Sequence, residues 1–157
     1  MFHSLLPLVV IAVTATAAGM ALLFGDEPAR LAGAINFLNA VALPFYRMIS
    51  PGPTGEALQL AGDFCWAAGL LILVIRHASL WLGVTMLLQS VQFGLHAYYI
   101  VMELRHDRLH AWVNNLDEVG ISACILVGAY AAIRRRAEAV REARALGAGA
   151  QRLSGAV

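Results

Sequence analysis

Seven polar residues recur along one apolar stretch of the chain, and their side chains are of the kinds that bind metals, exchange protons or form buried hydrogen bonds. They are Gln89, Gln92, His96, Tyr99, Glu103, His106 and His110. Their intervals of 3, 4, 3, 4, 3 and 4 residues place all seven on one face of a continuous helix. Since polar side chains are costly in contact with lipid, we expect this face to lie against protein, water or a ligand.

The last part of this pattern has the spacing of a metal site. Glu103 and His106 stand at i, i+3, as in carboxylate-bridged di-iron bundles, and His106 and His110 stand at i, i+4, which lets two imidazoles share one ion. The chain has no second Glu-x-x-His motif, so a full di-iron site is not expected. The metal hypothesis is a single ion held by Glu103, His106, His110 and either Asp117 or its neighbour Glu118.

Two other apolar segments have a polar face as well. One has Glu56, Gln59, Asp63 and Trp66 at helical spacing, and the other has Asn115, Glu118 and Ser122. In the expected arrangement these faces meet at similar depth, so His96 should pair with Asp63 or Glu118. The predicted buried polar cluster is Asp63, Gln92, His96, Tyr99 and Glu118.

Several chemistries are compatible with such a cluster. A quinone or lipid-headgroup pocket would use His96, Tyr98 or Tyr99, and Asp63 for hydrogen bonds, with Trp66 and Phe93 as walls. A proton relay through Asp63, His96 and Glu118 is the other possibility, although the inner half of the bundle has few groups to continue it. Haem ligation by two histidines of one chain is disfavoured, because only His96 lies deep in a predicted span.

Composition places the chain among membrane proteins. Of its 157 residues, 60% are hydrophobic and 13% are charged, which is outside the range of soluble globular domains. The net charge of +1 argues against nucleic-acid binding. No Gly-x-Ser-x-Gly, His-Glu-x-x-His or phosphate-binding glycine motif occurs, so the sequence leans away from an enzyme. Cys65 and Cys124 are expected as small buried hydrophobic residues.

The expected fold is all-α: an integral membrane four-helix bundle over residues 1–133, with a helical tail. The spans are about 5–24, 57–75, 80–104 and 113–133, since about 20 apolar residues cross a bilayer. Residues 28–49 are expected as an interfacial helix after the first span; the alternative is a fifth span, which would reverse the N-terminus. Residues 134–157, rich in Arg and Ala, form the cytoplasmic tail.

The distribution of Arg residues orients the four-span arrangement. One side has Arg76 and the run Arg134, Arg135, Arg136, Arg141 and Arg144; the other has Arg30, Arg47, Arg105 and Arg108. Because Arg and Lys are enriched in cytoplasmic loops, both termini are predicted to be cytoplasmic, in a multi-pass protein of the bacterial inner membrane.

Two functional hypotheses follow. The first is an accessory or assembly subunit of a larger membrane complex, whose polar helix face serves helix–helix contact within the bundle or with a membrane-protein partner or second copy. Gly69, Gly83, Gly94 and Gly128 would permit close backbone approach. The second is a metal, quinone or other small-ligand site in the outer half of the bundle, with a redox or transport role.

Overall fold

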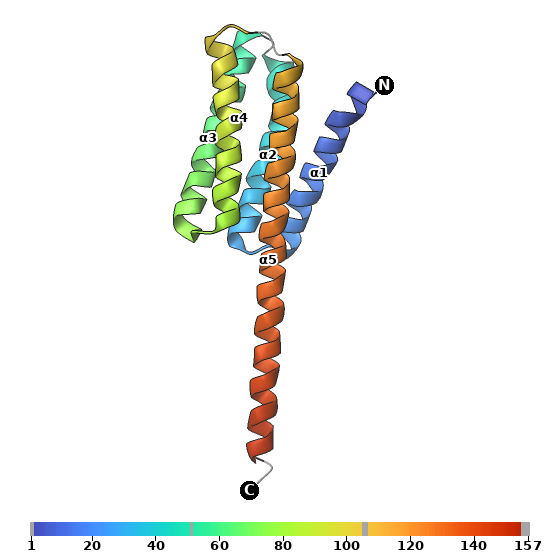
Figure 1. Ribbon diagram of the computed structural model, residues 1–157, viewed down its shortest axis with the longest axis vertical. Helices are drawn as coiled ribbons and strands as arrows, with labels where there is room; N and C mark the ends of the chain where they lie inside the picture. The colour runs from blue at the N-terminus through green and yellow to red at the C-terminus, as the bar shows by residue number, and fades with distance from the viewer. Residues whose placement is uncertain (1, 51, 105–106, 155–157) are drawn as a thin grey trace.

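The computed structural model describes residues 2–50, 52–104 and 107–154, and over these residues the chain is helical apart from short turns. The five helices are α1 (Phe2–Phe24), α2 (Glu27–Ile49), α3 (Pro53–His77), α4 (Leu80–Val101) and α5 (Arg108–Ser154). They run alternately up and down beside one another, and α5 continues far beyond the rest of the bundle (Figure 1). The all-α prediction is confirmed.

Helix α2, which contains the segment expected to be interfacial, lies lengthwise in the bundle against α1 and α3 (Figure 1). It buries Ala29, Ala32 and Asn36 in the interior. It therefore packs lengthwise as a fifth helix of the bundle (Figure 1). With five alternating helices, the start of α1 and the end of α5 lie at opposite ends of the molecule (Figure 1), whereas four rods would bring them to the same end.

Length and composition make two of these helices candidate membrane spans among the described residues. They are Thr54–His77 and Arg108–Leu146. Two of the four predicted spans thus fall within helices that have the length and hydropathy needed to cross a membrane.

The predicted continuous helix from Gln89 to His110 is wrong. Helix α4 ends at Val101, Glu103 adopts a left-handed conformation with φ 52°, and His110 belongs to the first turn of α5. The physical reason lies at Asp107, whose Oδ1 accepts the backbone N–H of His110 at 2.8 Å. This is an N-cap, and it satisfies one of the free donors at the start of a new helix.

Close helix packing depends on fewer of the expected glycines than predicted. A Cβ on Gly128 would lie 2.6 Å from the ring of Trp81, so the indole occupies the space beside this glycine. A Cβ on Gly69 would make an ordinary contact, and one on Gly83 or Gly94 would have no neighbour within 4 Å. Only Gly128, of these four, is required by packing.

The bundle interior has an apolar half and a polar half. Near the turns that join α1 to α2 and α3 to α4, it is filled by residues such as Ala21, Leu70, Leu73, Leu82 and Ala129. Near the α4–α5 turn, the buried side chains include Asp63, Gln92, His96, Tyr99 and His110. The polar half contains the candidate site.

Candidate functional site

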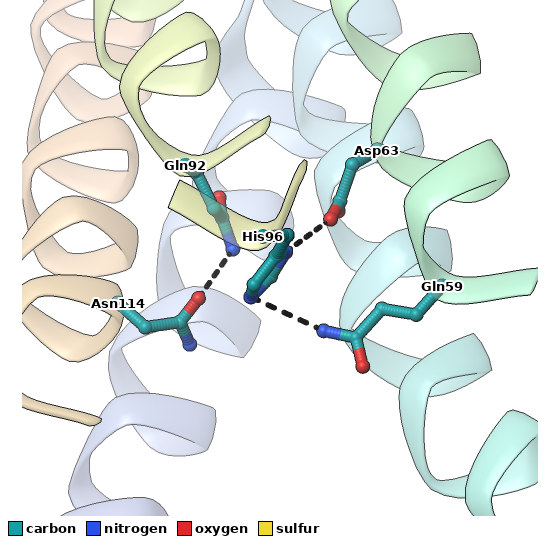
Figure 2. Close-up of polar contacts among 5 residues, drawn as sticks. All are labelled: Gln59, Asp63, Gln92, His96 and Asn114. Carbon is teal, nitrogen blue, oxygen red and sulfur yellow. Dashed lines mark hydrogen bonds and ion pairs between the residues drawn. The ribbon is translucent and has the colours of Figure 1, made fainter. Parts of the chain in front are cut away.

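His96 lies between helices with both ring nitrogens engaged (Figure 2). Its Nδ1 is 2.5 Å from Oδ2 of Asp63 on α3, and both residues are less than 5% exposed. Its Nε2 is 3.4 Å from Nε2 of Gln59, also on α3. In the tautomer with the proton on Nδ1, the ring donates to Asp63 and accepts from the Gln59 amide, so one neutral imidazole satisfies both contacts.

Helices α4 and α5 face each other through a series of matched polar contacts, here called the α4–α5 ladder. Its members are Tyr99–Asp107, with a 2.8 Å hydrogen bond, His96–His110, with ring centroids 5.0 Å apart, and Gln92–Asn114, with a 2.9 Å hydrogen bond. From one pair to the next, the residue number falls by three and then four on α4 and rises by three and then four on the α5 side. This is the register expected of antiparallel helices. The ladder joins the two helices from the α4–α5 turn into the interior.

Asp107 closes the outer end of the ladder. Its Oδ1 accepts the backbone N–H of His110 and the hydroxyl of Tyr99, each at 2.8 Å. These two hydrogen bonds, the backbone one first, lower the pKa of Asp107 below its ordinary value of 3.8 because they favour the ionised carboxylate. The ring of His110 also packs edge-on against Tyr99, with centroids 4.6 Å apart. The start of α5 is therefore fixed against the end of α4.

Glu118, expected as a member of the same cluster, faces a different part of the bundle. Its Oε1 accepts hydrogen bonds from Thr14 of α1 at 2.9 Å and from Asn36 of α2 at 3.1 Å. Consecutive residues of a helix point about 100° apart. Asp117 and Glu118 therefore diverge, and His96 pairs with Asp63 alone of the two expected acids.

Sequence reasoning missed Thr14 and Asn36 as partners of Glu118. Each is part of a small-residue face at helical spacing, formed in α1 by Thr14, Ala17, Ala18 and Ala21 and in α2 by Ala29, Ala32, Gly33 and Asn36. A Cβ on Gly33 would lie 2.8 Å from Cβ of Ala21, so α1 and α2 pack very closely here. The two small-residue faces were the available signal, since such faces mark close helix contacts in membranes.

The residues of the metal hypothesis are not assembled in the part of the chain that the structure describes. His106 lies outside the described residues, Glu103 is exposed in the turn after α4, and His110 and Asp117 are buried on α5. Among the described residues, no three His, Cys, Asp or Glu side chains are grouped so that they could hold a metal ion.

Of the side chains suggested for a quinone pocket, some are buried and others are exposed. Trp66 is 2% exposed, whereas Tyr98 is 54% exposed, so Tyr99 rather than Tyr98 faces the interior. Phe93 packs against Phe64 with ring centroids 6.1 Å apart, and Phe64 is itself 60% exposed. Cys65, expected to be buried, is exposed as well.

Comparisons of the chain with protein-family models, with curated proteins and with solved structures found no match.

Proposed function

We propose that this protein is an accessory or assembly subunit of a bacterial inner-membrane complex, a five-span bundle that presents the end of α5 to a partner in the cytoplasm. The observation that carries the proposal is the length of α5. It is one helix of 47 residues, about 70 Å long at 1.5 Å per residue. The C-terminal part of α5 extends beyond the other helices (Figure 1).

The Arg distribution supports this orientation when α2 is counted as a span. The end of the bundle from which α5 emerges then has Arg30, Arg76, Arg134, Arg135, Arg136, Arg141 and Arg144. Among the described residues, the opposite end has Arg47 and Arg108. The positive-inside rule accordingly favours a cytoplasmic C-terminus and a periplasmic N-terminus. Moving Arg30 to the basic end makes the asymmetry larger than in the four-span arrangement.

Where α5 leaves the bundle, it is held to the turn between α1 and α2. The guanidinium of Arg135 lies 2.5 Å from Oδ2 of Asp26, and that of Arg136 donates to the carbonyl oxygen of Gly25 at 2.9 Å. These contacts give the extension a defined direction. A helix that projects into water in a defined direction is suited to docking.

The extension has features of a binding surface. Val140 is 50% exposed and Leu146 is 77% exposed, and Arg141 and Arg144 lie between them. At about 100° per residue the two apolar side chains lie about 120° apart around the helix, so a partner that contacts both must wrap around the extension and would meet the arginines with acidic groups. In contrast, His96, Asp63 and Glu118 have hydrogen-bond partners within the chain, which supports a packing role for these polar side chains.

The test is subunit composition. The full-length protein is purified from its native membrane in mild detergent and analysed by native mass spectrometry, beside a Val140→Glu/Leu146→Glu variant and a control, Ile72→Ala, at a 63% exposed site on α3. We expect a stoichiometric partner with the wild type and the control, and its loss from the double variant. The same composition in all three samples would contradict the proposal.

The same samples test the small-ligand alternative. Stoichiometric metal by elemental analysis, or a chromophore in the absorption spectrum, in protein without a partner would favour a ligand site in the outer half of the bundle.

A further inference from the structure

The α4–α5 ladder leads to a fourth pair of buried side chains. One further step of three residues down α4 from Gln92 reaches Gln89, and the same step along α5 from Asn114 reaches Asp117. Gln89 is fully buried and Asp117 is 5% exposed. The register of the ladder therefore places the amide of Gln89 opposite the carboxylate of Asp117.

Several polar atoms at this level and at the adjoining level of Gln92 have no hydrogen-bond partner among the described residues. They are Oε1 and Nε2 of Gln89, Oε1 of Gln92, Oδ2 of Asp117 and Nε1 of Trp66. Trp66 lies at the level of Gln92 because it follows Asp63 by three residues on α3, and Asp63 contacts His96 on the antiparallel α4. A buried polar group without a partner is destabilising. A bound ligand would satisfy these groups.

Charge in this part of the bundle indicates the nature of the ligand. The buried acids are Asp63 and Asp117, and Glu118 is partly buried; His96 contacts Asp63, and Glu118 accepts hydrogen bonds from the neutral groups of Thr14 and Asn36. Asp117 has no cationic side chain in a hydrogen bond or ion pair among the described contacts. An isolated carboxylate in a low-dielectric interior is strongly unfavourable. A bound cation or a proton would neutralise it.

We propose that Gln89, Gln92 and Asp117 form a site for a small monovalent cation between α4 and α5. The three unpartnered oxygens, two from amides and one from a carboxylate, are suitable ligands for a hard cation. A divalent ion is a poorer fit, because Ca²⁺ takes 6–8 oxygen ligands and several charges. This proposal is independent of the partner proposed for α5.

The experiment uses the purified full-length protein in lipid nanodiscs, with Na⁺ as the probe. Unfolding midpoints are measured in NaCl, KCl and choline chloride at equal ionic strength, and Na⁺ binding is measured by calorimetry. We expect a saturable rise of the midpoint with Na⁺ or K⁺ over choline, because a ligand that binds the folded state stabilises it. Equal midpoints in all three salts would overturn the proposal.

Variants separate a cation site from simple packing. Asp117→Asn and Gln89→Leu should lose the Na⁺ response, while Glu138→Gln on the exposed extension should keep it. Gln89→Glu should bind the cation at least tenfold more tightly, because it adds a second carboxylate, whereas a packing role would make it as harmful as Gln89→Leu. A full Na⁺ response in Asp117→Asn would show that the acid is not a ligand. Identical behaviour of Gln89→Glu and Gln89→Leu would also contradict the site.

Discussion

His96 is the residue on which the polar half of the bundle most depends. It contacts Asp63 and Gln59 on α3 through its two nitrogens, and its ring lies beside that of His110 on α5. Three helices therefore meet at one side chain. Removing the imidazole would leave the carboxylate of Asp63 buried without its partner.

The first prediction concerns this side chain. His96→Ala should lower the unfolding free energy by roughly 3–5 kcal/mol, the usual cost of breaking a buried pair by deleting one partner. His77→Ala is the control, since His77 is half-buried at the end of α3 and has no such pair; it should cost less than about 1 kcal/mol. Unfolding in mixed micelles measures both. Equal costs would show that the Asp63 contact does not stabilise the bundle.

Asp107 gives a prediction about pH. Its hydrogen bonds lower its pKa in the folded state, so its contribution to stability is present above the ordinary value of 3.8 and is lost as the pH falls through that value toward the folded pKa. Asp107→Asn retains an N-cap but cannot titrate. Unfolding midpoints measured from about pH 6 to about pH 2 should therefore fall less for the variant than for the wild type. Parallel curves for the two proteins would contradict this role.

At the scale of the elements, residue periodicity predicted the buried face of α4 but not the end of that helix. Gln89, Gln92, His96 and Tyr99 are buried on α4 as their spacing indicated. The 3, 4 spacing of polar residues continues through His110 because the facing sides of α4 and α5 are both polar. Spacing alone does not reveal that a turn separates the two helices. The interruption depends on the cap at Asp107, which is a local contact that the periodicity analysis did not consider.

The packing partners of α2 were missed for a different reason. Its polar residues suggested a position at the membrane surface, but Asn36 is buried and donates to Glu118, which is 82 residues away in sequence. A single sequence does not reveal such a distant partner. For the same reason, helix existence and the inward polar faces could be predicted, whereas the choice of Asp63 over Glu118 as the partner of His96 could not.

Packing of α4 on α5 gives a prediction with a closely matched control. Gly128→Ala adds a methyl group where the Trp81 ring lies, 2.6 Å from the new carbon, and should destabilise the protein by about 1–3 kcal/mol through overpacking. Gly83→Ala makes the same change on α4 in open space and should be neutral or stabilising by up to about 1 kcal/mol. The two unfolding free energies can be compared directly, because both variants make the same Gly-to-Ala change within a helix and gain the same helix propensity. Similar values would show that Trp81 moves aside freely.

At the scale of the whole molecule, five helices of alternating direction place the two termini at opposite ends of the bundle. If all five span the membrane, the termini lie on opposite sides of it. Reporter domains fused separately to the N-terminus and to the C-terminus should be active in the periplasm and the cytoplasm, respectively. The physical reason is the concentration of Arg at the end from which α5 emerges. Cytoplasmic activity of both fusions would instead favour the four-span arrangement, with α2 outside the membrane.

The unbroken course of α5 has a mechanical consequence. Asp117, deep among the other helices, and Leu146, near the far end, belong to one stiff rod and are separated by about 44 Å along its axis. The contacts of Arg135 and Arg136 with the α1–α2 turn hold this rod near the point where it emerges. If the buried end of α5 tilts while the arginine contacts hold, the distal end of α5 moves in the opposite direction.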